Sequence, residues 1–187
     1  MKPILLTAAV ALMLSACSTV PAPRGAPGPV ASTVSTARSA TVNLASASAS
    51  LVSGRLIATP MGGGVHLRGE IGGLAPNSTH AIHIHEHGDC SAVDASSAGG
   101  HFNPSGSPHG KAGAGPHHAG DMDNVVANAQ GVARVDIHAS GVTLGGGAAN
   151  DVAGRAVVVH AAADDYNSQP AGNAGARVAC GVIAVDR

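Results

Sequence analysis

Residues 81–90 read AIHIHEHGDC, a short segment in which apolar residues alternate with histidines. Alternation with a period of two predicts a β-strand, because successive side chains of a strand point to opposite faces. Ile82 and Ile84 then share one face, and His83 and His85 share the other. Two imidazoles on one strand face have the spacing of two ligands to one metal ion, although a polar strand face that happens to carry histidines has the same pattern.

The chain on both sides of this segment has a similar pattern. From about residue 41, short apolar alternations are separated by glycines and by turn pairs such as Pro76-Asn77. No segment of adequate length shows an apolar stripe with the helical period. Several short strands joined by turns predict an all-β sandwich or barrel. The predicted strands cover residues 41–47, 51–59, 64–69, 81–85, 132–138, 156–160 and 177–185.

Two long segments, residues 88–128 and 161–176, contain no predicted strand. Loops longer than about 15 residues within a compact domain are usually functional. Both segments carry side chains that can bind metals or protons, histidines in the first and aspartates in the second. We therefore expect the functional residues to lie in these two loops or directly beside them.

Composition sets further limits on the function. The chain has 187 residues, with one Phe, one Tyr and no Trp, so a single domain must build its core from Val, Ile, Leu and Ala. The formal net charge is −1, so nucleic acid is not an expected partner. All 11 histidines lie beyond residue 65, and their number is far above ordinary usage. A surplus of neutral imidazoles indicates metal binding.

The N-terminal segment predicts export. Residues 1–17 combine the positive charge of Lys2 with a short apolar stretch at 4–14, as a secretory signal does. That stretch is too short to span a bilayer as a permanent helix. It ends in Leu14-Ser15-Ala16-Cys17, which resembles the cleavage box of bacterial lipoproteins and implies a lipid anchor on Cys17. Plain export, with Cys17 incidental or lost, is the alternative.

The rest of the chain divides into a tether and a domain. Residues 18–40 are rich in Pro, Ala, Ser and Thr, which predicts a solvated tether, and residues 41–187 form the expected domain. If Cys17 carries the lipid, Cys90 and Cys180 are left as the two remaining cysteines. An oxidising compartment would join them in a disulfide.

A second group of potential metal ligands follows the histidine-bearing strand. Three imidazoles and one carboxylate lie within 21 residues of one another in the sequence. Such a donor set can close around one ion as a tetrahedral site, which suits zinc. The four residues are His101, His109, His118 and Asp121.

Other histidines are assigned differently. His117 is an alternative to its neighbour His118, but the His-x-x-Asp spacing selects His118. Further along the chain, His160 ends an apolar strand and two aspartates follow it at 164 and 165. His87 would share the strand face of His83 and His85, but Gly88 is expected to end the strand, so His87 is not assigned as a metal ligand. Solvated surface positions are predicted for His66, His80 and His138, with a hydrogen bond beside the metal ligands as the alternative for His80.

Five short segments carry most of these residues: HIHEHGDC at 83–90, GHFNP at 100–104, HAGD at 118–121, VH at 159–160 and RVACGVI at 177–183. Taken in this order, they resemble the successive signatures of the copper/zinc superoxide dismutases. The likeness covers about residues 41–187. No single segment is decisive, but five in the family's order are highly specific.

The resemblance implies a fold and a set of residue roles. The fold is an eight-stranded Greek-key β-barrel or sandwich with two long functional loops. Arg177 matches the arginine that receives the anionic substrate, and Asp164 matches a carboxylate that joins a copper ligand to a zinc ligand. Cys90 and Cys180 match the family's disulfide, and His101 matches a ligand that bridges the two metals and delivers a proton. By the same correspondence, one copper is held by His83, His85, His101 and His160, and one zinc by His101, His109, His118 and Asp121.

The resemblance also implies an activity, the dismutation of superoxide to O2 and H2O2 by a copper centre that cycles between Cu(II) and Cu(I). Together with the export signal, it predicts an oxidoreductase that is lipid-anchored in the cell envelope of a bacterium and faces the periplasm or the exterior. There it would protect the envelope from extracytoplasmic superoxide. The expected partners are the superoxide anion, the lipid bilayer and, as a candidate, a second copy of the chain in a homodimer.

Two other functions fit parts of the sequence. A non-enzymatic copper- and zinc-binding envelope lipoprotein would need the ligands, but it would not need Arg177, Asp164 or a bridging position. A β-sandwich interaction module with accidental histidines would bind no stoichiometric metal. The segment 161–176 departs from the family because it contains no lysine, which puts the strength of electrostatic steering in doubt, and Lys111 is the candidate replacement.

Overall fold

The computed structural model describes residues 33–187. The predicted signal segment, the cleavage box with Cys17 and most of the predicted tether lie outside the described residues. The chain divides into two units, residues 1–30 and 31–187, and the fold is that of the second unit. Within the described part of the chain, no helix is long and apolar enough to cross a membrane.

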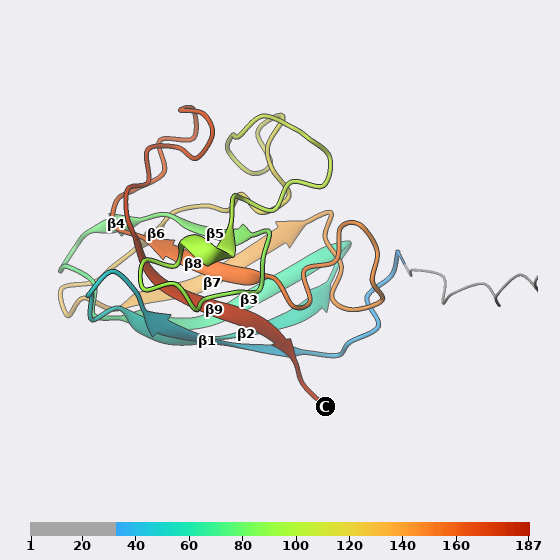
Figure 1. The fold of residues 1–187 in the computed structure, drawn as a ribbon, viewed down its shortest axis with the longest axis horizontal. Helices are drawn as coiled ribbons and strands as arrows, with labels where there is room; N and C mark the ends of the chain where they lie inside the picture. Colours follow the sequence, from blue (N-terminus) through green and yellow to red (C-terminus); the bar gives the residue numbers. More distant parts are fainter. Residues whose placement is uncertain (1–32) are drawn as a thin grey trace, which may run out of the picture. The chain divides into compact units, whose positions relative to one another are not determined.

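The domain is a curled β-sheet with one short 3-10 turn, η1, at Ser96–Ala98 (Figure 1). Every strand is short, as the spacing of glycines and turn residues predicted. The strands of the described residues are β1 Ala40–Ser46, β2 Ser53–Met61, β3 Gly64–Gly72, β4 Thr79–His80, β5 Ile82–His85, β6 Val125–Val126, β7 Ala133–Ser140, β8 Ala156–His160 and β9 Arg177–Val185.

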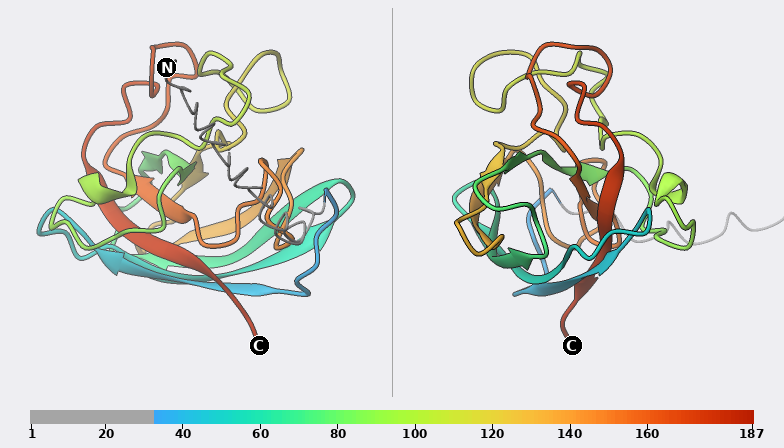
Figure 2. Two further views of the ribbon diagram at one scale, coloured as in Figure 1. Left: turned by 45° about the vertical axis from the view of Figure 1, so that its right-hand side comes forward. Right: turned by 90° about the vertical axis from the view of Figure 1, so that its left-hand side faces the viewer.

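The strands close into a barrel. Seven of them form one antiparallel sheet in the order β5-β8-β9-β1-β2-β3-β7, and β4 pairs with β6. A bridge between Ala127 and Ala133 joins the β6 segment to β7. Strands β4 and β5 are one strand interrupted at Ala81, so the ring contains eight strands, which wrap around a common centre (Figure 2). The connections from β3 to β4 and from β7 to β8 cross between non-neighbouring strands, as in a Greek key.

The all-β prediction is confirmed, and all seven predicted strands are present with ends that differ by at most three residues. One part of the prediction was wrong. Strand β6, Val125–Val126, lies inside the segment 88–128 that was expected to contain no strand. Two residues are too few to show a period, and their pairing with β4 is a contact between distant parts of the chain.

The core consists of the inward-facing aliphatic side chains of the strands. Ile82 and Ile84 of β5 are fully buried in it, together with Leu56 and Leu67 from the opposite part of the barrel. Burial of each such side chain contributes about 1.5–3 kcal/mol relative to exposure. The alternation of β5 therefore holds the strand by its isoleucines and leaves both histidines on the other face.

The two long loops rise from the same side of the barrel, as both views of Figure 2 show. They cover the outer face of β5 and β8, so all residues of these two strands are buried. A small second cluster of Ala95, Ala98, Val158 and Cys180 packs beneath the first part of segment 88–128. Cys90 forms a disulfide with Cys180 of β9, which confirms the predicted pairing.

The described end of the predicted tether lies against the barrel. The backbone N–H groups of Thr36 and Ala37 both donate to the carbonyl of Leu144, and the hydroxyl of Ser35 accepts from the N–H of Leu144. Ser39 donates to the carboxylate of Asp186. Residues 35–39 are therefore attached to the domain by hydrogen bonds.

Removing the disulfide with the double variant Cys90→Ala/Cys180→Ala should lower the free energy of unfolding by about 4 kcal/mol, because the bond closes a loop that spans 90 residues. Urea denaturation of metal-free protein, followed by circular dichroism, measures the change. The unchanged protein should lose a similar amount in a thiol reductant, whereas the variant should not respond to it. Equal stabilities with and without the bond would contradict this account.

Candidate metal centre

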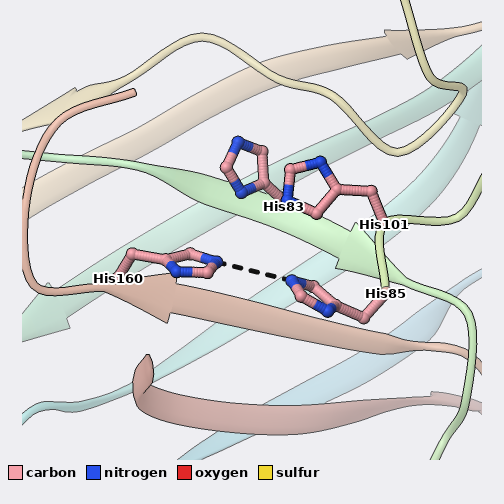
Figure 3. Close-up of side chains that lie close together, drawn as sticks. All are labelled: His83, His85, His101 and His160. Carbon is pink, nitrogen blue, oxygen red and sulfur yellow. Dashed lines mark hydrogen bonds between the residues drawn. The ribbon is translucent and has the colours of Figure 1, made fainter. Parts of the chain in front are cut away.

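The predicted ligands of the first group come together over two neighbouring strands. Strands β5 and β8 are antiparallel, with His83 opposite Val158 and His85 opposite Ala156. His160 is the last residue of β8, and its N–H donates to the carbonyl of Ala81. Figure 3 shows the rings of these histidines gathered over the two strands, with His101 arriving from the loop.

Backbone pairing with β5 positions His101 beside the other histidines of the first group. The N–H of Phe102 donates to the carbonyl of Ile84 at 2.8 Å, and the N–H of Ile84 donates to the carbonyl of Gly120 at 2.9 Å. His101 itself forms a bridge with His85. A Cβ atom at Gly120 would collide with the carbonyl of Ile84, so this approach requires glycine. The segment 88–128 therefore extends the sheet locally at the point where its ligands are needed.

The result is two groups of four ligands that share one residue. In each group the candidate ligand atoms lie within 4.8 Å of one another, and all the residues are buried. His101 belongs to both groups, and its ring centroid lies 3.9 Å from that of His83. The first group is His83, His85, His101 and His160, and the second is His101, His109, His118 and Asp121.

In the first group, two nitrogen lone pairs face each other. The Nδ1 atoms of His85 and His160 lie 2.9 and 3.4 Å from the carbonyl oxygens of Gly99 and Gly175. A carbonyl only accepts, so each Nδ1 carries the proton and each Nε2 carries a lone pair. The two Nε2 atoms are 3.4 Å apart (Figure 3). Burial lowers the pKa of His85 to about 2 and that of His160 to about 3, so no proton lies between these atoms at neutral pH.

The other two histidines of this group leave buried nitrogens unpaired. His83 donates from Nε2 to Asp164 at 2.8 Å, which leaves the Nδ1 atom as an acceptor without a partner. The Nε2 atom of His101 is likewise buried and has no hydrogen-bond partner. An unpaired buried polar atom is costly unless something fills its place. Four nitrogens that converge in this way, two facing each other and two without a hydrogen-bond partner, fit a metal ion.

The second group is built around one carboxylate. Asp121 places Oδ1 at 2.8 Å from Nδ1 of His101 and 3.0 Å from Nδ1 of His109, and Oδ2 accepts from the backbone N–H groups of Gly110 and His118. Burial raises the pKa of Asp121, but the hydrogen bonds from His101 and these backbone groups outweigh it and hold the pKa well below the usual range. The carboxylate is therefore ionised, and three imidazoles with one carboxylate match a tetrahedral zinc site.

Asp164 connects the two groups. Its Oδ2 accepts from His83 and its Oδ1 accepts from Nε2 of His109 at 3.0 Å, so one buried carboxylate orients a ring in each group. Burial raises the pKa of Asp164, and hydrogen bonds from His83, the Tyr166 N–H and His109 lower it by more. The outer hydrogen bond of a metal-binding histidine sets its tautomer and the direction of its lone pair.

Arg177 lies beside the first group. Its guanidinium donates to the carbonyls of Ala95 at 2.7 Å and Gly99 at 2.6 Å. The carbonyl of Gly99 also accepts from His85, so a single oxygen links the positive charge to a ring of the first group. Gly99 has a φ of 73°, and a Cβ atom there would collide with the side chain of Glu86. The carbonyls of Gly99 and Gly175 orient the site, although no side-chain pattern in the sequence identifies them.

Lys111, the candidate replacement for the lysine missing from segment 161–176, lies against that segment. Its Nζ is 5.3 Å from the ring centroid of Tyr166, which follows Asp164 by two residues. The ring of an aromatic side chain attracts a cation. Lys111 therefore adds a positive charge next to segment 161–176, which has no lysine of its own.

The structure corrects two of the histidine predictions. His66 and His80 are buried, with 8% and 6% of their surface exposed, whereas both were expected on the surface. His66 is held by Asp136 at 2.6 Å, and His80 donates from Nδ1 to the carbonyl of His160 at 2.8 Å. The second contact is the alternative raised for His80. Of the neighbouring pair 117 and 118, it is His118 that joins the second group, and His117 contacts the carbonyl of Gly115.

The metal-free protein should lose stability as the pH falls from about 6.5 towards 3. Unfolding returns His85 and His160 from a pKa of about 2 and about 3 to 6.5, so the unfolded chain binds more protons in this window. The lost stability approaches about 1.4 kcal/mol per pH unit for each such histidine. The raised pKa of His109 opposes the effect, but it is outnumbered by the lowered ones. Urea titrations at several pH values measure the slope.

Two variants make that measurement specific. His160→Gln should flatten the slope, because it removes one of the buried neutral imidazoles. His87→Gln, at an exposed histidine outside both groups, should leave the slope unchanged. A stability that stays constant or rises on acidification would contradict the assignment of neutral rings.

Comparisons with known proteins agree with this geometry. The sequence model of the copper/zinc superoxide dismutase family matches residues 52–183. Superoxide dismutase (Cu-Zn) 2 of Aquifex aeolicus (strain VF5) is 46% identical over 123 residues, which cover 64% of this chain and 72% of that protein. The superoxide dismutase (Cu-Zn) of Caulobacter vibrioides is 43% identical over 125 residues, which cover 64% and 71%.

Solved structures show the same fold. The crystal structure of a SOD-like protein from Bacillus subtilis is 34% identical, with a TM-score of 0.69, and the match covers 76% of this chain and 97% of that chain. The crystal structure of the clock protein EA4 is 36% identical, with a TM-score of 0.72, and the match covers 81% and 97%. The chain therefore belongs to the copper/zinc superoxide dismutases, a family of oxidoreductases that use one copper and one zinc ion and act on superoxide.

Proposed function

We propose that this chain dismutes superoxide at a copper ion held by the first group of ligands, beside a zinc ion held by the second group. The observation that carries the proposal is the convergence of four imidazole nitrogens in the first group, two facing each other and two buried without partners. The proposed copper ligands are His83, His85, His101 and His160, and the proposed zinc ligands are His101, His109, His118 and Asp121.

The donor atoms support this distribution of metals. Four imidazoles without a carboxylate suit copper, and three imidazoles with one carboxylate suit zinc. Thiolates play no part, because Cys90 and Cys180 are joined in the disulfide. When bound, copper supplies the one-electron chemistry that turns one superoxide into O2 and a second, with two protons, into H2O2.

His101 is suited to move one of those protons. Its Nδ1 atom faces Asp121 in the second group, and its Nε2 atom points into the first group without a hydrogen-bond partner. Nε2 is therefore an atom that can hold a proton whenever it is not serving as a ligand, and no competing acceptor takes the proton from it. We propose that His101 delivers this proton to the reduced product.

Arg177 is suited to attract and orient the substrate anion. Its guanidinium is fixed by the carbonyls of Ala95 and Gly99, so the positive charge cannot swing away from His85. A fixed charge at the edge of a buried site focuses the field and raises the encounter rate of a small anion. Asp164 accepts from Nε2 of His83 and of His109, which turns the Nδ1 atom of His83 towards the first group and that of His109 towards the second.

Arg177→Ala should keep both metals, slow superoxide dismutation by about tenfold or more, and weaken the dependence of the rate on ionic strength. Pulse radiolysis over a range of salt concentrations, on protein whose copper and zinc contents are measured, gives both quantities. Arg134→Ala, which removes an exposed arginine from the outer face of β7, is the matched control. An Arg177→Ala rate and salt slope equal to those of the control would remove Arg177 from the proposal.

His85→Ala serves as the second arm of the same experiment. It should lose copper and activity together while zinc is retained, since His85 belongs to the first group alone. Circular dichroism of the variant shows whether the barrel has formed. A folded variant that keeps full activity per chain would contradict the proposed copper site.

We also propose that the protein is anchored by a lipid on Cys17 in a bacterial cell envelope, with the predicted tether of residues 18–40 between the lipid and the domain. The leader and its cleavage box support this location. The disulfide supports it as well, because such bonds persist in oxidising compartments and because it leaves Cys17 as the one cysteine outside the domain. A homodimer also stays a prediction.

Cys17→Ser should move the protein from the membrane fraction to the soluble fraction of the envelope. Mass spectrometry of the N-terminal peptide from the unchanged protein should show a mass increase that corresponds to the acyl chains. Thr19→Ser, a similar change two residues away, should leave the protein in the membrane fraction. An unmodified Cys17 in membrane-extracted protein would contradict the anchor.

A further inference from the structure

A hydrogen bond between the side chains of His109 and Asp164 joins the two long loops beside the second group of ligands. His109 belongs to segment 88–128 and Asp164 to segment 161–176, and Nε2 of His109 lies 3.0 Å from Oδ1 of Asp164. Both residues are buried, with 4% and 3% of their surface exposed. Their backbone N–H and C=O groups lie outside any strand, so these groups need partners from elsewhere.

A glutamine provides the partners for His109. The side-chain Oε1 of Gln169 accepts from the N–H of His109 at 2.9 Å, and its Nε2 donates to the carbonyl of the same residue at 2.9 Å. One amide therefore satisfies both backbone groups of His109. Gln169 lies on segment 161–176, so both bonds cross from one loop to the other.

An asparagine does the same for Asp164 in the opposite direction. The side-chain Oδ1 of Asn124 accepts from the N–H of Asp164 at 2.8 Å, and its Nδ2 donates to the carbonyl of Asp164 at 2.9 Å. The backbone N–H of Asn124 also donates to the hydroxyl of Tyr166 at 2.8 Å. Each partner in the hydrogen bond between the loops is thus held by an amide from the other loop.

We infer that Gln169 and Asn124 are positioning residues. Their side-chain amides, each paired with the backbone of one residue of the other loop, are called the amide clasps here. The two clasps set how tightly the second group of ligands retains zinc. The inference rests on the zinc assignment proposed above. Loops of this length have a large conformational entropy, and a ligand that must be ordered for each binding event binds more weakly. By fixing the backbone at both ends of the His109–Asp164 bond, the clasps order the ligand in advance.

The chemistry of the clasps requires an amide. A side chain that pairs with both groups of one backbone residue must donate and accept at the same time, and only an amide offers a donor and an acceptor side by side. A carboxylate of the same shape accepts from the N–H but repels the carbonyl. The variant Gln169→Glu therefore separates the hydrogen-bonding requirement from the volume of the side chain.

The two clasps should differ in which group of ligands they affect. Gln169 holds His109, which belongs to the second group alone. Asn124 holds Asp164, whose other carboxylate oxygen accepts from His83 of the first group. Removing the amide of Gln169 should therefore weaken zinc binding alone. Removing the amide of Asn124 should weaken zinc binding and also change the geometry of the first group.

The test is a chelator competition that measures the zinc affinity of the full chain with one zinc per chain. Gln169→Ala, Gln169→Glu and Asn124→Ala should each weaken zinc binding by about 10–100-fold, the usual effect of removing a group that orients a metal ligand. Asn173→Ala is the matched control, because its amide bonds only to Asp165 and Ser168 within its own loop. The control should bind zinc as tightly as the unchanged protein.

Copper spectroscopy supplies the second measurement. With copper and zinc both bound, Asn124→Ala should change the electron paramagnetic resonance spectrum, and Gln169→Ala should leave it close to that of the unchanged protein. Unaltered zinc affinity in Gln169→Ala, or an equal loss in Asn173→Ala, would overturn the inference. If the unchanged protein itself fails to bind zinc, the proposed zinc site fails instead, so the two failures are distinguishable.

Discussion

Six imidazoles and two carboxylates are buried side by side in this protein, and their need for partners constrains everything around them. A buried polar atom without a partner is costly, and a buried charge without one is costlier. The protein meets this need by giving each of the four rings of the first group an outer partner, which is a backbone carbonyl for His85 and His160 and a carboxylate for His83 and His101. The inner nitrogens are then left as lone pairs that point at one another, an arrangement that a bound cation stabilises.

The barrel and the loops divide this task. The barrel supplies β5 and β8, whose side chains Ile82, Ile84, Val157 and Val159 are held in the core while the histidines face outward. The loops supply the acceptors, the carboxylates and the cover that excludes water. Backbone pairing of the segment around His101 and Gly120 with β5 joins the two parts, and the disulfide holds the beginning of the same loop to β9.

Electrostatics around the site depend on a few well-held charges. Segment 161–176 lacks lysine, but two positive charges lie close to it: Arg177 donates to two carbonyls beside the first group, and Lys111 lies over the ring of Tyr166 of that segment. The negative charges of Asp121 and Asp164 are fully buried and face histidines. The second aspartate of the segment, Asp165, bonds to Ser168 and Asn173 within its own loop and shapes it.

Local pattern was sufficient to predict the seven longer strands and the four ligands of the second group, since period and spacing are properties of neighbouring residues. The resemblance to the family, rather than local pattern, placed His160 in the first group and made His101 the shared ligand, and counting cysteines pointed to the disulfide. Tertiary structure decided what depends on contacts between distant segments. It paired the two-residue β6 with β4, buried His66 and His80, and set ring tautomers through the carbonyls of Gly99 and Gly175. It also brought the amides of Gln169 and Asn124 across the loops. The roles of backbone carbonyls and of single Gln or Asn side chains cannot be recognised in a sequence, because each role depends on the partner that folding places beside the group.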